Sequence, residues 1–521
     1  MKKRLPIGTQ SFSKLRREGC VYVDKTEHIY KMVSTGGSIY FLSRPRRFGK
    51  SLLISTLDEL FSGHKELFEG LYIYDKWDWT QQYPVIWLDF GKRSFDSQEE
   101  LKISLDDFVN AMADKYQLTL RERTLNGKFG ELIEKIAQST RKKVVVLVDE
   151  YDKPIIDHLS NIEVLNTNKK ILHNFYSVLK ASDKYIRFIL LTGVSKFSGL
   201  SVFSALNNPD DITLDWKYVS ICGYTQEELE YYFTDYIDEV ADYENISRDE
   251  LLDKIRTWYN GYSWDGKTAV YNPFSTLLLF SKNKFDNYWF RTGTPTFLIE
   301  VLKSRNQIKP VLEAIETDSS AFDSYDPVNI GEIPLLFQTG YLTIKHIKRI
   351  ADQEIYTLAF PNLEVRNSFF KYLLNAYSNY PPEQIQPLTF KMQQQIHNGD
   401  VSGLQQNLQL LLAHIPNNLH IPKEAYYHSL FLLLMKVLGF DIQGEIPTNI
   451  GRIDAVWHQP DLTVVSEIKY HSEKDIDTLL QEAMTQIHDR KYYEAYLDKK
   501  VILMAIAFTG KEVKCELNYE L

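Results

Sequence analysis

Cysteine is scarce in this 521-residue chain, where Cys20, Cys222 and Cys515 stand far apart. Their spacing excludes a disulfide framework and a cysteine-based metal site, and it favours a reducing compartment. Long apolar runs are missing as well, since the strongest late run, residues 430–434, is far too short to span a bilayer. The basic N-terminus lacks the apolar stretch of a secretory signal. We therefore expect a cytoplasmic protein with no membrane partner.

An excess of positive charge is also absent. The formal net charge is −9, from 60 Lys and Arg against 69 Asp and Glu. A mildly acidic protein does not attract nucleic acid over its whole surface, so binding to DNA would need a local basic patch. With 44% apolar and 25% charged residues, the chain can fill ordinary globular cores. Its length predicts roughly three to four domains.

One glycine is missing from the most informative stretch, SRPRRFGKSLLIS at residues 43–55. Apolar residues 38–42 predict a strand before it, and the apolar spacing of residues 51–61 predicts a helix after it. Such a turn aims backbone N–H groups and the positive helix end at a phosphate. In the consensus G-x-x-x-x-G-K-[ST], Lys50 reaches the β- and γ-phosphates of ATP, and Ser51 binds Mg²⁺. Arg44, however, stands where the first glycine belongs.

Three arginines in this loop have more than one interpretation. Their guanidinium groups match phosphate geometry, which favours a place for Arg44, Arg46 and Arg47 at the nucleotide. The alternatives are a contact with DNA, or ion pairs with acids of a neighbouring domain or subunit, which would imply self-association through the ATPase domain. The candidate nucleotide-binding residues of the loop are Arg44, Arg46, Arg47, Phe48, Gly49, Lys50, Ser51 and Leu52.

Two further strands end in polar residues. Residues 143–151 (KVVVLVDEY) predict a strand buried on both faces, whose acids would lie where open α/β sheets bind ligands. Asp149 would hold Mg²⁺ and Glu150 would act as the general base on water. Residues 186–192 predict the next strand, after which Thr192 and Ser195 are candidates to position that water. The alternatives are ordinary polar strand ends and a glycine turn.

A different constellation lies in the last hundred residues. Asp454 opens a predicted strand, and Glu467 and Lys469 lie two apart on the next, so both face one side. The 13 residues from Asp454 to Glu467 allow a hairpin that brings the three together. Two carboxylates and a lysine fit Mg²⁺-assisted hydrolysis of a phosphodiester, with Asp454 and Glu467 as metal ligands and Lys469 orienting the water or the oxyanion. The alternative is a surface hairpin with a solvated Glu–Lys pair.

These motifs together resemble a known bacterial family, AAA-ATPase-like proteins fused to a C-terminal PD-(D/E)xK nuclease-like domain, over nearly the full length. The matching strings are IGTQSF, YVDKT, RPRRFGKSL, LVDEYDKPI, LTGVSKFS, WYNGY, YNPFS, EAYYHSLFLLL, GRID, EIK and QIHDRKYY. RPRRFGKS is the normal form of this family, so the resemblance implies a working variant of the loop. It also implies Glu424 as a metal-binding acid on a helix and Gln486 as the polar residue after ExK. Two departures are that Ile453 replaces the usual proline and that Arg490 stands where one subgroup has tyrosine, with Tyr492 two residues later.

The predicted fold is therefore α/β with four parts. They are a P-loop NTPase domain with a parallel sheet (1–222), a helical lid (223–325), a winged-helix-like module (326–382), and a helical linker with a restriction-endonuclease-like PD-(D/E)xK domain (383–521). The winged-helix-like hairpin contains Lys345, Lys348 and Arg349, which would meet a phosphate backbone or else protect a solvated sheet edge.

Three functions fit these sequence features. The first is an ATPase whose nucleotide state controls a Mg²⁺-dependent nuclease acting on DNA or RNA. The second is a nucleotide-dependent signalling switch whose C-terminal domain binds nucleic acid or protein without cleaving it. The third is a non-enzymatic module with a structural P-loop. ATP and Mg²⁺ are the expected cofactors of the first two.

Overall fold

The computed structural model describes residues 2–34, 39–92, 95, 97–159, 161–197, 209–290, 315–322, 331–378, 381–414, 423–437, 440–448, 451–458, 462–510 and 512–519. The chain divides into two compact units, residues 1–297 with 316–365, and residues 298–315 with 366–521. The division falls within one helix, α16 (Leu363–Ser378). The finer division into four parts stays a prediction, and the expected end of the lid at residue 325 lies outside the described residues.

The first unit is built on a parallel sheet of five strands in the order β2-β3-β4-β1-β5. Its strands are β1 (Ile39–Ser43), β2 (Val85–Asp89), β3 (Val144–Asp149), β4 (Ile186–Gly193) and β5 (Asp210–Asp211). Every residue of β3 is buried, as its unbroken Val/Leu run predicts for a strand covered on both faces. The parallel α/β sheet expected from the sequence is confirmed.

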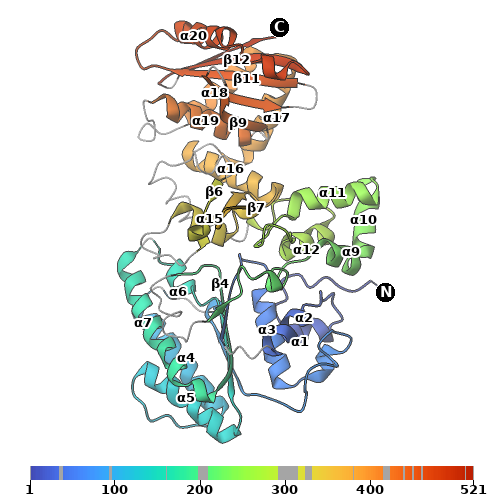
Figure 1. Ribbon diagram of the computed structural model, residues 1–521, viewed down its shortest axis with the longest axis vertical. Helices are drawn as coiled ribbons and strands as arrows, with labels where there is room; N and C mark the ends of the chain where they lie inside the picture. The colour runs from blue at the N-terminus through green and yellow to red at the C-terminus, as the bar shows by residue number, and fades with distance from the viewer. Residues whose placement is uncertain are drawn as a thin grey trace. The chain divides into compact units, whose positions relative to one another are not determined.

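Helices cover both faces of this sheet (Figure 1). One side carries α1 (Phe12–Arg17), α2 (Thr26–Ser34) and α3 (Lys50–Ser62), and the other carries α4 (Gln98–Lys115), α5 (Leu125–Thr140) and α7 (Ile162–Ala181). A short helix, α6 (Lys153–Ile156), follows β3. Parallel strands need such crossover connections, which place helices on the two faces.

The helical segment after the sheet begins where the sequence predicts. It contains α9 (Gln226–Tyr232), α10 (Thr234–Glu244), α11 (Arg248–Tyr259) and α12 (Pro273–Lys282). Thr225 is the N-cap of α9 and forms a capping box with Glu228. Leu229, Ile237 and Leu251 pack in one core with Val21 and Val23, so the N-terminal segment is part of this helical body.

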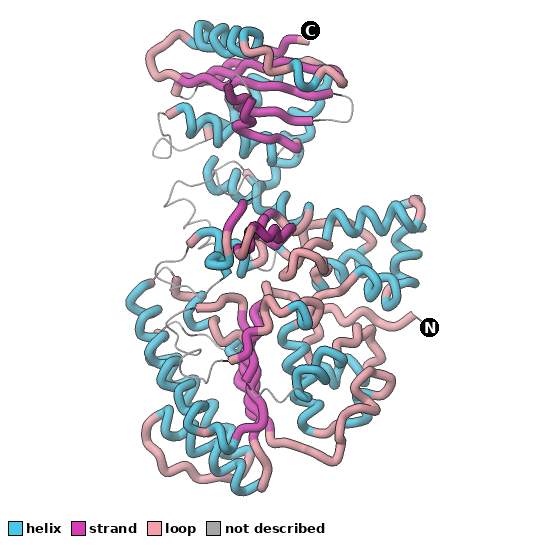
Figure 2. Tube along the Cα trace, in the orientation of Figure 1, coloured by secondary structure: helices cyan, strands magenta, loops and turns pink. Residues whose placement is uncertain are grey.

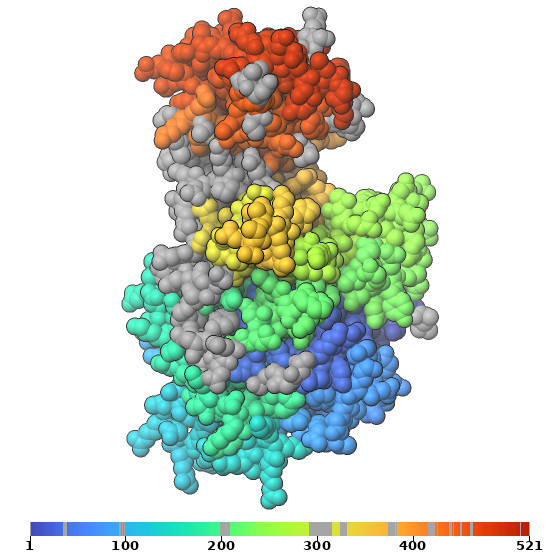
Figure 3. Space-filling model, in the orientation of Figure 1, coloured from blue at the N-terminus to red at the C-terminus, as the bar shows by residue number. Residues whose placement is uncertain are grey.

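The next module of the first unit combines one helix with a small sheet. Helix α15 (Glu332–Thr339) precedes an antiparallel hairpin of β7 (Thr343–Ile350) and β8 (Gln353–Ala359), with β6 (Ile315–Thr317) beside β8. Space-filling atoms of this hairpin lie beside those of the helical segment (Figure 3), and Ser263 N donates to Thr343 Oγ1 at 2.7 Å. A helix followed by a hairpin agrees with part of a winged helix, but that assignment stays a prediction.

The second unit contains a mixed sheet in the order β13-β12-β11-β10-β9 (Figure 2). Its strands are β9 (Asp441–Thr448), β10 (Gly451–His458), β11 (Leu462–Tyr470), β12 (Lys500–Thr509) and β13 (Glu512–Asn518). Only β11 and β12 pair in parallel, with α20 (Ile476–Asp489) between them in sequence. The remaining helices are α17 (Pro382–Asn398), α18 (Val401–Ala413) and α19 (Glu424–Val437). The predicted order of helix, strand, Asp strand, ExK strand, helix and strand is confirmed, with β13 added.

The described ranges contain no helix that is both long and apolar enough to cross a membrane. Cys20, Cys222 and Cys515 are all buried and form no disulfide with one another.

Candidate nucleotide and nuclease sites

The P-loop connects β1 to α3 through a left-handed turn at Gly49. Gly49 has φ 96° at the N-cap of α3, a conformation that glycine adopts without strain. The next residue, Lys50, is buried, and its Nζ donates to the carbonyl oxygens of Arg44 at 2.8 Å and Pro45 at 3.0 Å. Burial lowers the pKa of Lys50, and the nearby carboxylates of Asp149 and Glu150 oppose that shift. A cation held over its own loop in this way has the position that a phosphate-binding lysine needs.

Arg44 points into the protein. Its side chain is fully buried, and Nη1 donates to the carbonyl oxygens of Ser43 at 2.8 Å and Thr213 at 2.9 Å. Nη2 donates to the Tyr218 carbonyl at 3.2 Å, and the guanidinium lies 3.8 Å from the ring centroid of Trp264. The arginine therefore ties the end of β1 to the segment after β5, and its protein partners leave the expected contact with nucleotide without geometric support.

Arg46 and Arg47 are exposed, unlike Arg44. The Arg46 carbonyl accepts a hydrogen bond from Trp289 Nε1 at 3.0 Å. Burial raises the pKa of Glu150, and the positive charge of the Arg46 guanidinium partly opposes that rise. Arg47 has φ 66°, and its guanidinium lies 5.2 Å from the ring centroid of Phe274. Both side chains therefore lie where a ligand or a partner could meet them.

Acids meet the P-loop at the carboxyl edge of the sheet. Because the strands are parallel, Ser43 lies beside Gly193 and Asp89 beside Asp149 at the ends of neighbouring strands. Asp149 is buried, and its Oδ1 accepts from Thr192 Oγ1 at 2.6 Å. The structure thus brings together Asp149, Thr192 and the β1 end, at the edge where α/β sheets bind ligands.

Glu150 turns sharply away from β3. Its φ of 54° is left-handed, which is strained for a residue with a side chain, and its N–H donates to Asp149 Oδ1 at 3.1 Å. A Cβ built on Gly91 would lie 2.9 Å from Glu150 Oε2 and 3.1 Å from Asp89 Oδ1, so the two carboxylates are neighbours. Burial raises the pKa of Glu150, with Lys50 opposing and Asp149 adding to the increase. A raised pKa and a strained turn suit a general base.

Two further acids near the candidate nucleotide site were missed from the sequence. Asp152 is buried and its Oδ2 accepts from the backbone N–H groups of Val194 at 2.9 Å and Ser195 at 2.6 Å. It thereby fixes the loop after β4, and burial raises its pKa to about 6. Asp89, at the end of β2, is the other. The signals were present, since DEYD carries a third acid and VIWLD repeats the pattern of VVVLVD.

A cavity adjoins the P-loop on the side of the helical segment. Its walls are mostly apolar, and they come from the N-terminal segment, the start of α3 and the chain that enters α9. The lining residues are Pro6, Leu15, Val21, Tyr22, Val23, Lys25, Phe48, Gly49, Leu52, Leu53, Thr56, Ile221, Cys222, Gly223, Tyr224 and Pro273. A mostly apolar slot with few polar groups, next to a phosphate-binding turn, is suited to a flat base.

In the second unit the predicted nuclease residues converge. Lys469 Nζ donates to Glu467 Oε1 at 2.9 Å, and Gln486 of α20 donates to the same oxygen. On the adjacent strand, Asp454 Oδ2 accepts from the Ile468 N–H at 2.8 Å. The hairpin and the shared face expected from the sequence therefore hold for all three of Asp454, Glu467 and Lys469.

The donor set at this point fits a divalent cation. Glu467 is almost fully buried, and its Oε2 has no hydrogen-bond partner among the residues that the structure describes. Burial, followed by the charge of Asp454, raises its pKa to about 7, and Lys469 opposes the rise. A bound cation would satisfy that oxygen and offset the repulsion between the two carboxylates, which are the hard ligands Mg²⁺ prefers.

Glu424 has less support as a third ligand. It is exposed in the first turn of α19, and its charge acts on both Glu467 and Lys469. Within the part of the chain that the structure describes, no group of three or more His, Cys, Asp and Glu is placed to hold a metal. The role of Glu424 as a metal ligand stays a prediction.

The basic hairpin is largely occupied with protein contacts. Lys345 Nζ donates to the Pro361 carbonyl at 2.8 Å, and Arg349 Nη2 lies 2.7 Å from Glu354 Oε1. Lys348 Nζ is 3.7 Å from Glu316 Oε1. This pattern favours the protected sheet edge over the phosphate-binding wing.

Comparison with known proteins agrees with the two predicted domains. Residues 6–203 match the family model described as a predicted AAA-ATPase, and residues 422–517 match the PD-(D/E)XK nuclease superfamily. The chain is similar to an "Uncharacterized protein in vnfD 5'region" of Azotobacter chroococcum mcd 1, with 39% identity over 504 residues, covering 95% of this chain and 94% of that protein. The chain therefore belongs to this family of proteins, in which an N-terminal AAA-ATPase-like domain is joined to a C-terminal PD-(D/E)XK nuclease superfamily domain.

Proposed function

We propose that this protein is an ATPase whose nucleotide state controls a Mg²⁺-dependent nuclease on the same chain. The observation that carries the proposal is the buried, unpartnered Oε2 of Glu467, beside Lys469 and Asp454. Leaving a buried carboxylate oxygen without a partner costs free energy, so such groups mark sites with a missing ligand. A solvated surface hairpin would contain no such group.

The ATPase half rests on the geometry of the sheet edge. Lys50 would exchange the carbonyls of Arg44 and Pro45 for phosphate oxygens, and Ser51 with Asp149 would hold Mg²⁺. Mg²⁺ supplies charge neutralisation for the phosphates. Glu150 would take the proton of the attacking water, while Thr192 would act mainly by holding Asp149 in place.

The nuclease half assigns roles to four residues. Asp454 and Glu467 would hold the metal, whose charge stabilises the phosphate oxygens. Lys469 would orient water or the developing oxyanion, and Gln486 would fix the Glu467 carboxylate through its hydrogen bond. Nucleic acid, with DNA as the expected form, is the partner implied by this chemistry. The three free thiols support a reducing, cytoplasmic setting.

The direct test is cleavage of a panel of single- and double-stranded DNA and RNA with Mg²⁺, with and without ATP. We expect ATP-dependent cleavage that Glu467→Ala and Lys469→Ala abolish. A matched control is Lys474→Ala, which removes an exposed lysine paired with Glu482 and should cleave normally. If the Glu467 and Lys469 variants cut as well as the wild type, the nuclease proposal fails. If nucleotide changes the assembly of the protein but no substrate is cut, the signalling switch replaces it.

Calorimetry separates ATP binding from the cleavage result. We expect the wild type to bind ATP with Mg²⁺ and Lys50→Ala to lose most of that affinity. An absence of binding in both proteins would leave the P-loop a structural element.

A further inference from the structure

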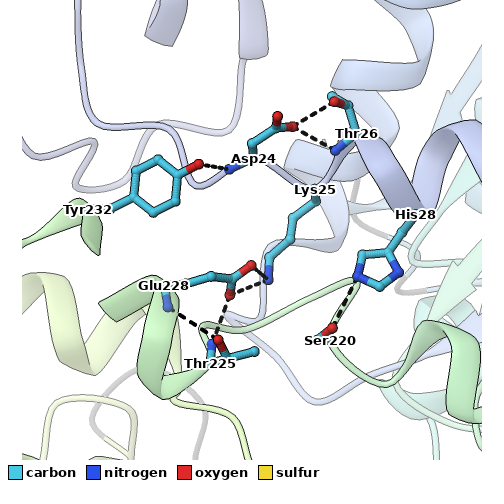
Figure 4. Close-up of polar contacts among 8 residues, drawn as sticks. All are labelled: Asp24, Lys25, Thr26, His28, Ser220, Thr225, Glu228 and Tyr232. Atoms are coloured by element: carbon cyan, nitrogen blue, oxygen red, sulfur yellow. Dashed lines mark hydrogen bonds and ion pairs between the residues drawn. The ribbon is translucent and has the colours of Figure 1, made fainter. Parts of the chain in front are cut away.

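The YVDKT string at residues 22–26 has no role in the function proposed above, yet its backbone is fixed from several sides. Asp24 Oδ1 accepts from the N–H and Oγ1 of Thr26 at 2.8 and 2.6 Å, and Asp24 Oδ2 accepts from the Tyr72 N–H at 2.7 Å. The Asp24 N–H donates to the Tyr232 hydroxyl at 3.3 Å (Figure 4). These contacts hold Lys25 between α2 and α9.

The Lys25 ammonium reaches across to the helical segment. Both Glu228 carboxylate oxygens accept from Lys25 Nζ at 2.6 Å, as Figure 4 shows. Glu228 also accepts from the Thr225 N–H at 2.8 Å in the capping box that begins α9. An ammonium has three N–H donors, and both of the hydrogen bonds found for Lys25 within the described ranges end on Glu228. One donor is therefore left for the cavity that Lys25 lines beside Gly49.

An ion pair that takes a lysine out of water is a costly way to dock two elements, and here Lys25 is the buried partner while the Glu228 side chain is 22% exposed. Lys25 is 9% exposed, and removing it from water lowers its pKa, while Glu228 opposes that shift. Hydrophobic pairs often serve docking equally well, because desolvation offsets much of the Coulomb attraction. A lysine ammonium in the wall of a mostly apolar cavity is therefore better explained by a ligand that needs its polar group.

The position of the cavity indicates what this ligand is. Gly49 borders both the cavity and the proposed phosphate site, so a nucleotide with its phosphates at Lys50 would direct its base toward the cavity. Leu52, Leu53 and Pro273 offer apolar surface to the ring faces. A purine presents unprotonated ring nitrogens, which accept hydrogen bonds, and the unused N–H of Lys25 is a donor.

We propose that Lys25 binds the base of the nucleotide by donating a hydrogen bond to a purine ring nitrogen, and that its ion pair with Glu228 connects base binding to α9. The inference rests on the proposed ATP binding at the P-loop. It makes Lys25 a residue that determines specificity for the base, while Lys50 serves the phosphates.

The experiment compares ATP with ribose 5′-triphosphate, which has the phosphates and no base. In the wild type, we expect ATP to bind more tightly than ribose 5′-triphosphate. Lys25→Met should weaken ATP binding roughly 10- to 100-fold, which is the effect of losing one hydrogen bond from a charged donor. The affinity for ribose 5′-triphosphate should be unchanged. Tyr232→Phe is the matched control, since it removes a contact of the same segment on Asp24 and should keep the preference for ATP.

Three outcomes would overturn the inference. Equal weakening of both ligands in Lys25→Met would make Lys25 structural, and unchanged affinity for both ligands would remove its contact with the base. A wild type that binds ribose 5′-triphosphate as tightly as ATP would also exclude it while leaving the P-loop proposal standing. Binding of neither ligand would instead end the proposed function, and this inference with it.

A second measurement does not depend on a variant that folds. The wild type is titrated with 1-deaza-, 3-deaza- and 7-deaza-ATP, each of which lacks one ring nitrogen. One of the three should bind roughly 10- to 100-fold more weakly than ATP. Equal affinity for all three and for ATP would contradict the hydrogen bond.

Discussion

Replacing Arg44 with glycine would restore the consensus sequence of a P-loop, and we expect this substitution to lower the stability of the protein. Arg44→Gly removes three hydrogen bonds from a charged donor to the carbonyls of Ser43, Thr213 and Tyr218. At about 1.5–3 kcal/mol each, these contribute roughly 4–9 kcal/mol. Burial lowers the pKa of Arg44 to about 10, so roughly 3 kcal/mol of desolvation cost is recovered when the charge is removed.

The hole left beside Trp264 adds a further loss of about 1–2 kcal/mol. The net loss is on the order of 5 kcal/mol, which is a large part of the stability of a typical domain. Urea unfolding of the full chain should show an earlier first transition. Hydrogen exchange should locate the loss in β1 and residues 213–218, and ATP affinity should fall as well.

Arg47→Gly is the matched control for this prediction. Arg47 is also an arginine of the loop, but it is exposed and has φ 66°, so glycine relieves strain there. Its stability should change by less than about 1 kcal/mol. If Arg44→Gly were as stable as the wild type and bound ATP at least as tightly, Arg44 would be no more than a tolerated replacement.

Three further predictions follow from individual residues. Burial raises the pKa of Glu364 to about 8, so the folded state holds a proton that the unfolded state releases near pH 4.5. The free energy of unfolding should therefore fall as pH rises between these two values. In urea titrations, Glu364→Gln should remove that dependence on pH. Gly193→Ala would place a Cβ 2.6 Å from Asp152 Oδ1 and should cost about 2–4 kcal/mol in thermal unfolding, whereas Gly130→Ala, with its nearest neighbour at 3.7 Å, should be neutral or stabilising. Mg²⁺ affinity of the nuclease site should rise with pH up to about 7 and then level off, because the metal needs ionised Glu467; equal calorimetric affinities at pH 5.5 and pH 8 would contradict this.

Local patterns were sufficient for the buried strands beside the two sites and for much of the sites themselves. The Val/Leu run before Asp149 predicts a doubly buried strand, and the spacing of Glu467 and Lys469 predicts their shared face. The long span between Lys50 and Asp149 did not obscure the nucleotide site, because parallel strands bring their carboxyl ends to one edge.

Residues whose partners lie far away in sequence were not predictable. In the sequence, Arg44 has the position of a phosphate ligand. Its contacts in the structure are with Thr213, Tyr218 and Trp264, which lie about 170 to 220 residues later and which only the fold brings close. The contacts of Asp152 could not be predicted for the same reason, since only the fold brings its carboxylate to the N–H groups of Val194 and Ser195. The unpartnered oxygen of Glu467 is likewise a property of burial, which no spacing records.

The outer side of the P-loop is itself a packing surface. A Cβ on Gly340, after α15, would lie 2.7 Å from the Cβ of Pro45, and Trp289 Nε1 holds the Arg46 carbonyl. The loop therefore lies between two neighbours, the proposed nucleotide on one side and the α15 module on the other. If the chain hydrolyses ATP as proposed, substitutions at positions such as Gly340, which lie outside the proposed nucleotide site and carry no motif, should therefore also reduce that activity.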